Sequence, residues 1–183
     1  MRIEITAEIW NKIMNMGKHI ASGDGCREAL RGIHITCDES GACRAEACDG
    51  YVGGTLIFQA CGDNFVPGEC LIYPQAVRKY GRHEKPIITL ESDGGTVTFS
   101  DHGGSMTTRE IRCNYLDMQR VYPTTEPAAT VYFNPAYLEK ILKACKGENL
   151  VKVEFRRGID PVRIATADFN MLVLPVRTDE KEW

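Results

Sequence analysis

Three segments of the chain combine lysine and arginine with an apolar stripe, a pattern typical of amphipathic helices that can bind phosphate groups. The segments span residues 7–21, 74–85 and 134–147 and together carry a net charge of +6, whereas the whole chain carries −3. Basic helices on an acidic protein indicate one face suited to phosphates and another that repels them. Lysines that merely solvate exposed helix faces would fit the charge equally well. The residues considered as phosphate ligands are Lys12, Lys18, Arg78, Lys79, Arg82, Lys140, Lys143 and Lys146.

No constellation of residues typical of an enzyme accompanies these basic segments. The four histidines, at positions 19, 34, 83 and 102, lie far apart, and none belongs to an HExxH pair. The sequence also lacks a GxxxxGK phosphate loop, a strand–GxGxxG–helix unit, a GxSxG nucleophile motif and a kinase motif set. We therefore expect a protein that is not an enzyme and has no catalytic residues.

Eight cysteines are many for this length, so a cysteine-based metal or redox protein is one alternative. Their spacings include no CxxC pair of the kind that zinc sites favour. Several lie in strand-like runs, such as Cys37 in IHITC and Cys70 in ECLIY, where a thiol serves as a small hydrophobe. We expect reduced thiols, no metal and no cofactor.

Length and composition suit a small globular protein. The 183 residues (20.4 kDa) are 43% apolar and 26% charged, which is enough for a real core. No apolar run approaches the roughly 18 residues of a membrane helix. The charged start, MRIEITAEIW, is unlike a signal peptide. These features predict a soluble, cytoplasmic protein without a membrane partner.

The order of predicted elements repeats three times along the chain. Each copy has a short β-type run, a helix start, an amphipathic helix and then two or three strands with Gly-rich turns. The third copy begins with the expected strand TVYF (130–133), followed by Pro135 in the first helical turn. Aligned positions are Thr6, Tyr73 and Asn134 at the helix starts, then Lys12, Lys79 and Lys140, then Ile13, Tyr80 and Ile141.

This repetition predicts an α+β fold of three βαβββ units, with antiparallel sheets and the helices on one face. The alternation of Val151, Val153 and Phe155 is typical of strands in half-buried antiparallel sheets. The first two helices should lie side by side against one curved sheet layer, with Trp10 and Ile13 buried.

Several runs resemble the bacterial DNA polymerase III beta subunit, the sliding clamp. LRGIHITCDESGACRAEACDGYVGGTLIF resembles the start of the family's middle domain, and NYLDMQRVYP resembles its interdomain connector. FNPAYLEKILKACKGENLVKVEF, followed by PVRI and MLVLPVR, is similar to its C-terminal half-domain. The resemblance covers nearly the whole chain. It implies a DNA-clamp-like architecture in which helices line a DNA hole and strands face outward.

The resemblance also implies a domain organisation. Residues 1–113 would form a complete clamp domain of two units, residues 114–129 a connector, and residues 130–183 a half clamp domain. Family members have three domains of two units each, so the first domain and the first half of the third are missing here. Two further departures are Leu116 in place of the usual proline and Tyr51-Val52-Gly53 in place of His-Arg-Leu.

In the resembled family, partner proteins insert a short apolar motif into a groove built from the middle-domain turn, the connector and the final strand. An apolar slot with a few polar groups suits such a peptide, although MLVLPV could equally be a buried last strand. Pro175 favours the groove because proline marks a strand edge or break. The corresponding residues are Cys48, Gly50, Tyr51, Val52 and Gly53; Leu116, Arg120 and Val121; and Leu172, Val173, Leu174, Pro175, Val176 and Arg177.

The resemblance therefore implies a clamp-like processivity platform in DNA replication. It would encircle or lie against double-stranded DNA without sequence preference. Through the apolar motif it would bind a DNA polymerase, the clamp loader or repair proteins. The alternative is a clamp-derived adaptor or decoy that binds partner peptides without encircling DNA. An odd number of units leaves one half-domain with open sheet edges, so we predict a homo-oligomer, a dimer or tetramer.

Overall fold

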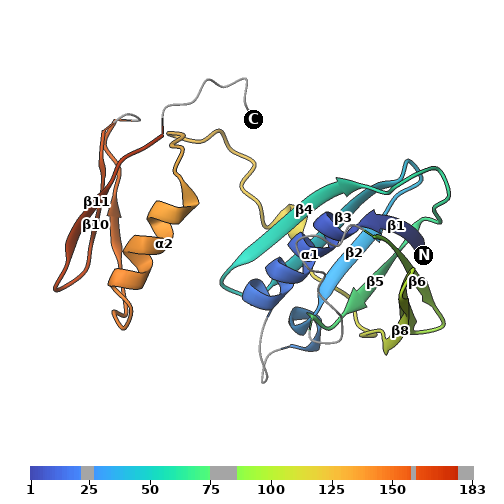
Figure 1. The fold of residues 1–183 in the computed structure, drawn as a ribbon. Helices are drawn as coiled ribbons and strands as arrows, with labels where there is room; N and C mark the ends of the chain where they lie inside the picture. Colours follow the sequence, from blue (N-terminus) through green and yellow to red (C-terminus); the bar gives the residue numbers. More distant parts are fainter. Residues whose placement is uncertain (22–26, 75–85, 158–159, 177–183) are drawn as a thin grey trace. The chain divides into compact units, whose positions relative to one another are not determined.

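The computed structural model describes residues 1–21, 27–74, 86–157 and 160–176, and it divides the chain into two compact units (Figure 1). The first unit spans Met1–Pro123 and the second Thr124–Trp183. Both are α+β structures in which every described strand pairing is antiparallel. None of the described helices combines the length and apolar character that a membrane crossing requires.

The first unit contains one long helix and eight strands among its described residues. In chain order they are β1 (Arg2–Thr6), α1 (Ala7–Ile20), the 3-10 helix η1 (Glu28–Arg31), β2 (Ile33–Cys37), β3 (Ala42–Cys48), β4 (Gly53–Gln59), β5 (Gly68–Ile72), β6 (Ile87–Asp93), β7 (Thr96–Asp101), β8 (Gly104–Arg109) and the 3-10 helix η3 (Met118–Arg120). Thr6 caps α1 as its sequence predicts, because its side-chain oxygen accepts from the Ile9 amide at 3.3 Å. The second predicted helix, 74–85, lies outside the described residues except for Pro74.

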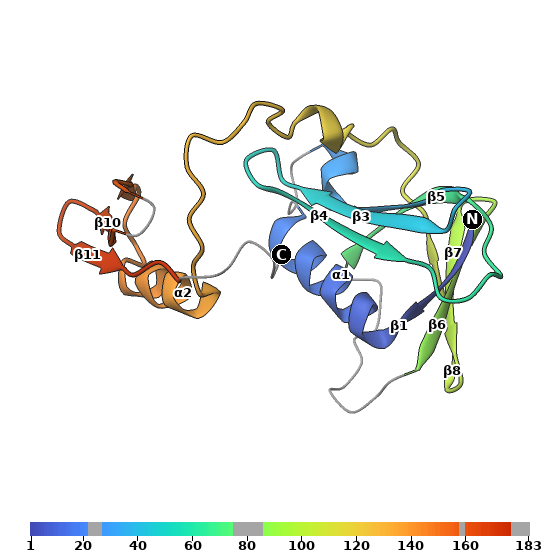
Figure 2. The same cartoon turned by 90° about the horizontal axis from the view of Figure 1, so that it is seen from above.

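In this unit, the first strand of each repeat belongs to the sheet formed by the other repeat. One sheet has the order β1-β6-β7-β8 and the other β4-β3-β2-β5. Strand β1, from the first repeat, therefore pairs with β6 of the second repeat, and β5 of the second repeat pairs with β2 of the first. Because each half supplies a strand to the other, the two halves form one domain. Figures 1 and 2 show α1 lying against both sheets.

A single core joins the two halves. Trp10 and Ile13 are both fully buried, as their place on the apolar stripe predicts. The Trp10 ring contacts Phe99 of β7, in the second half, with ring centroids 4.9 Å apart and planes tilted by 48°. Gly17 lies so close to Ile33 and Pro74 that an added Cβ would fall 2.2 Å from Ile33 Cδ1. Helix α1 therefore packs on elements of both repeats.

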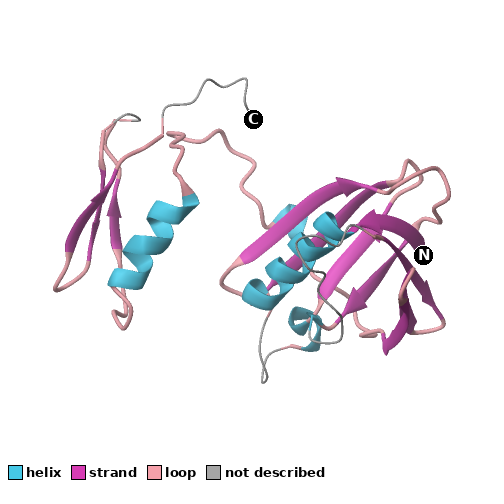
Figure 3. Ribbon diagram, in the orientation of Figure 1, coloured by secondary structure: helices cyan, strands magenta, loops and turns pink. Residues whose placement is uncertain are grey.

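The second unit is a single repeat with one helix over a three-stranded sheet (Figure 3). Its described elements are α2 (Pro135–Ala144), β9 (Lys152–Glu154), β10 (Val162–Ala165) and β11 (Asn170–Val173), with the strand order β11-β10-β9. Asn134 caps α2, since its side-chain oxygen accepts from the Ala136 amide at 2.9 Å. The expected strand at 130–133 is not formed as a regular strand in the described part of the chain, although Val176 N donates a backbone hydrogen bond to Tyr132 O at 2.8 Å.

One backbone hydrogen bond recurs at the same position of all three repeats. The carbonyl two residues before each aligned helix start accepts from the segment that follows the last strand of the same repeat. The donor and acceptor pairs are Cys61 N to Glu4 O (2.7 Å), Ile111 N to Leu71 O (2.8 Å) and Val176 N to Tyr132 O (2.8 Å). This recurrence supports the alignment made from sequence, because three unrelated amphipathic helices would not share it.

Candidate functional site

A tight turn between β3 and β4 presents part of the predicted peptide surface. The Asp49 carboxylate accepts from the amides of Tyr51 and Val52 at 2.8 and 2.7 Å, and these bonds hold the pKa of Asp49 below its usual value. Gly50 has φ of +95°, which favours glycine. The turn therefore holds the Tyr51 side chain in solvent, 98% exposed, with Val52 beside it.

The connector packs directly on this turn. Met118, at the start of η3, is only 3% exposed, and its Cε would lie 2.5 Å from a Cβ on Gly53. The Tyr122 hydroxyl lies 3.1 Å from Thr55 Oγ1, which joins the connector to β4. A side chain at position 53 would occupy the space of Met118, so the glycine permits this close contact.

Apolar side chains stay exposed around the junction of turn and connector. Val121 and Leu116 are 57% and 43% exposed, and Arg120 forms an ion pair with Asp117 at 3.0 Å. Exposed apolar groups beside a cation can hold a short peptide. We call this region the junction surface; it consists of Gly50, Tyr51, Val52, Gly53, Leu116, Arg120, Val121 and Tyr122.

Burial changes the role of two predicted contact residues. Cys48 and Val173 are only 6% and 3% exposed, so each supports the surface of its own unit and does not present a side chain. Strand β11 ends at Val173, and Leu172 and Leu174 on either side are exposed. Residues Leu172 to Val176 belong to the second unit, and the predicted Arg177 lies outside the described residues.

A histidine network next to the connector was not found from the sequence. His34 Nε2 lies 2.9 Å from a Glu69 carboxylate oxygen, and Nδ1 lies 3.5 Å from Glu46. The imidazole stacks on Tyr115, with centroids 4.8 Å apart, and burial raises the pKa of that phenol. This network holds the start of the connector on the sheet. It borders a hollow of about 370 Å³ that Leu116 also lines.

The described basic residues predicted to bind DNA are all exposed, but two of them already have acidic partners. Lys12 contacts Glu8 at 2.8 Å and Lys143 contacts Glu139 at 2.7 Å. The remaining ones are Lys18, Lys140 and Lys146, with the Lys140 ammonium 5.7 Å from the Tyr137 ring centroid. Arg78, Lys79 and Arg82 lie outside the described residues. Within the described ranges, no group of three His, Cys, Asp or Glu side chains is placed to hold a metal ion.

Sequence comparison finds no relative of the chain: no protein-family model matches it, and neither does any curated protein. Comparison of structures, in contrast, finds similar proteins. The DNA polymerase III beta chain of Streptococcus pneumoniae superposes with a TM-score of 0.80 over 97% of this chain at 17% identity. The chain has the sliding-clamp fold.

Two further structures with this fold are similar to the chain. The Caulobacter crescentus pol III beta protein matches 98% of it, with a TM-score of 0.69 and 15% identity. The Helicobacter pylori beta clamp, solved with a DNA ligase peptide bound, matches 96% of it, with a TM-score of 0.75 and 13% identity. The chain spans about half the length of these three proteins: 50%, 52% and 49%. The resemblance inferred from sequence is thus confirmed at the level of fold.

Proposed function

We propose that the chain is a non-enzymatic clamp-like platform that binds short apolar peptides of replication or repair proteins. The observation that carries the proposal is the sliding-clamp fold extending over 97% of the chain. The junction surface supports it, because rigid packing of Met118 on Gly53 holds the exposed Val121 and Tyr51 in place. A preformed surface loses little conformational entropy on binding, which favours affinity for a short peptide.

The test is binding of a fluorescently labelled DNA ligase peptide, followed by anisotropy. Val121→Glu and, separately, Leu116→Glu place a carboxylate where an apolar side chain would dock, so each should weaken binding at least about 10-fold, or about 1.4 kcal/mol. Met106→Glu is the matched control, because Met106 is also an exposed apolar residue, 37% exposed, but lies on β8.

Circular dichroism should show that all three variants stay folded, since each changed residue is exposed. Absence of binding by the unmodified chain, or equal binding by the two site variants and the control, would show that the junction surface is not the peptide site.

We also propose that the protein encircles double-stranded DNA or lies against it, with the basic faces of its helices toward the DNA. Contacts from exposed lysines would go to phosphates, so binding should be independent of sequence and weaken with salt. The triple variant Lys18→Ala, Lys140→Ala, Lys146→Ala should lose affinity equally for two unrelated duplexes. It should also show a smaller slope of log affinity against log salt.

The second candidate function is an adaptor that binds peptides without encircling DNA. It is favoured by the Glu8 and Glu139 carboxylates, which neutralise two helix lysines. No DNA association at low salt together with intact peptide binding would establish the adaptor. Salt-dependent association that is lost in the triple variant would establish the platform on DNA.

A further inference from the structure

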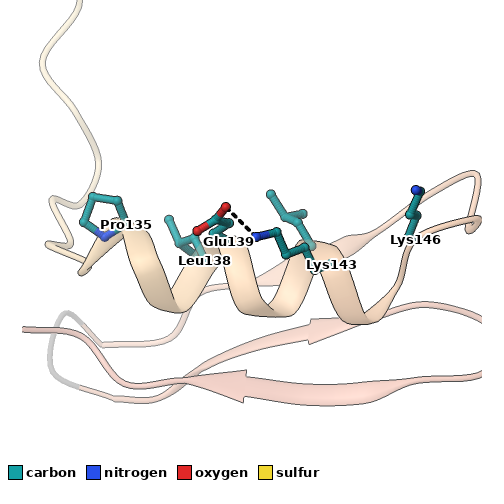
Figure 4. Close-up of a pocket in the computed structure, with 6 residues that line it drawn as sticks. Pro135, Leu138, Glu139, Lys143 and Lys146 are labelled. Atoms are coloured by element: carbon teal, nitrogen blue, oxygen red, sulfur yellow. Dashed lines mark ion pairs between the residues drawn. The ribbon is translucent and has the colours of Figure 1, made fainter. Parts of the chain in front are cut away.

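One flank of α2 is exposed where the aligned flank of α1 is buried. Alignment of the helix starts matches Leu142 with Met14 and Pro135 with Ala7. Met14 is 1% exposed, whereas Leu142 is 56% exposed. Figure 4 shows Pro135, Leu138, Glu139, Lys143 and Lys146 along one side of α2. Together with Leu142 they line an open groove of about 420 Å³.

The inner face of β9 is exposed to solvent in the same way. Val153 pairs with Ile164 of β10 and so points to the same side of the sheet as that buried residue. Val153 and Phe155 are nevertheless 43% and 56% exposed. The corresponding residue of β6, Leu90, is 0% exposed. Among the described strands, β9 is also the last of its sheet, with β10 on one side only.

In the first unit, the other half of the domain covers these positions. There Trp10 of α1 contacts Phe99 in the opposite half. The strand edge that corresponds to the open edge of β9 is paired with the first strand of the opposite half: β6 pairs with β1, and β2 pairs with β5. The registers are Ile5 with Ile88 and Ile72 with Ile33. The two complete repeats therefore show what kind of element fits the exposed groove and the open edge: another βαβββ half.

No further half lies between the two units. Only residues 124–129 separate the first unit from Thr130, which begins the third repeat. Among its described residues, the second unit buries a small cluster of Val162, Ile164 and Val173, with partly buried hydrophobic neighbours packed against it. Units of this size are marginally stable by themselves, so covering the exposed apolar face would add substantially to their stability.

We propose that a second copy of this chain covers this face, so that two half-domains pair about a twofold axis and complete one clamp domain. Each copy's 130–133 segment then lies along β9 of the other, as β1 lies along β6. Phe133 corresponds to Ile5, and Val151 corresponds to Ile88, so the register of Ile5 with Ile88 places Phe133 opposite Val151 of the second copy. The apolar part of the α2 groove, Leu138 and Leu142, closes against the second copy's sheet, as Trp10 closes on Phe99, and Lys146 stays exposed at its rim as the aligned Lys18 does. The same patch serves both copies, as a twofold interface requires.

Native mass spectrometry and light scattering of the full chain across a concentration series test this pairing. The unmodified chain should give twice the 20.4 kDa chain mass. Leu142→Glu and Val153→Glu bury a carboxylate in the proposed interface, so each should shift the chain to monomer. Val121→Glu, an equally exposed apolar residue of the first unit, should remain a dimer. Hydrogen exchange at Lys152–Glu154 should be slow in the dimer and fast in the two monomeric variants.

Three results would overturn the inference: a monomer at tens of micromolar, a dimer that persists in both variants, or fast exchange of β9 within a dimer. Circular dichroism distinguishes monomer formation from unfolding, because Leu142 and Val153 are exposed within one chain. The peptide assay is measured on the same samples. If a variant loses the dimer but still binds the peptide, the two proposals are independent. The same follows if a variant loses peptide binding but remains a dimer.

Discussion

Replacing Trp10 with alanine tests whether the first unit is one domain built from two repeats. Trp10 is fully buried on α1, and its ring contacts Phe99 from the other repeat. A buried indole removes about 200 Å² from water. At about 25 cal/mol per Å² this burial is worth about 5 kcal/mol. Alanine keeps a small part of that area and leaves a cavity, so we expect unfolding to become easier by about 3–5 kcal/mol.

Urea denaturation with hydrogen exchange measures this loss in both halves. With a urea dependence of about 2 kcal/mol per M, the unfolding midpoint of the first unit should fall by about 2 M. Peptides from β2 and from β7 should lose protection together, because Trp10 joins their two sheets. Trp10→Phe keeps a ring against Phe99 and should lose clearly less. A midpoint shift below about 0.5 M, or loss of protection in β2 alone, would refute a shared core.

Three further predictions concern other parts of the chain. Burial and the neighbouring Cys37 raise the pKa of Cys43 to about 12, so iodoacetamide at pH 8 should label exposed Cys113 and spare Cys43 until urea unfolds the protein; early labelling of Cys43 would contradict this. Lys152 and then Arg163 lower the pKa of Glu154 from 4.5, so its stabilisation is present above the unfolded pKa and lost as pH falls through the lower, folded value. Glu154→Gln should therefore lower the melting temperature of the second unit at pH 7 but not at pH 2, and an equal effect at both pH values would exclude the ion pairs as the cause. Met118→Ala should cost about 2–3 kcal/mol and weaken peptide binding, because it removes the side chain that fills the space above Gly53; unchanged peptide affinity would show that Met118 does not organise the junction surface.

Local signals in the sequence were sufficient to predict the described helices. The caps at Thr6 and Asn134 and the apolar stripe containing Trp10 and Ile13 act within a few residues, so sequence alone predicted where these helices begin and which face is buried. The strand at 130–133 was the exception. A strand depends on a partner, and the local pattern TVYF carries no information about whether one is present.

The candidate site was predictable only in part. The turn at 49–53 and the connector resemble family segments, and glycine at 50 marks a positive φ. The contacts that hold them together, Met118 on Gly53 and His34 on Tyr115, join residues 65 and 81 positions apart in the chain. No spacing rule connects such residues, because their contact depends on how β2, β3, β4 and the connector fold against one another.

By itself, the sequence predicted a threefold repetition of strand, helix and strands and determined where α1 and α2 begin, since capping and periodicity are interactions between near neighbours. Only the tertiary structure decided that β1 and β5 change places between the two sheets. The local pattern of each strand is equally compatible with either sheet, and the choice depends on long-range packing. The same exchange explains why Met14 is buried and Leu142 is exposed. Two helices with the same kind of apolar stripe differ because only one of them has a second half to pack against.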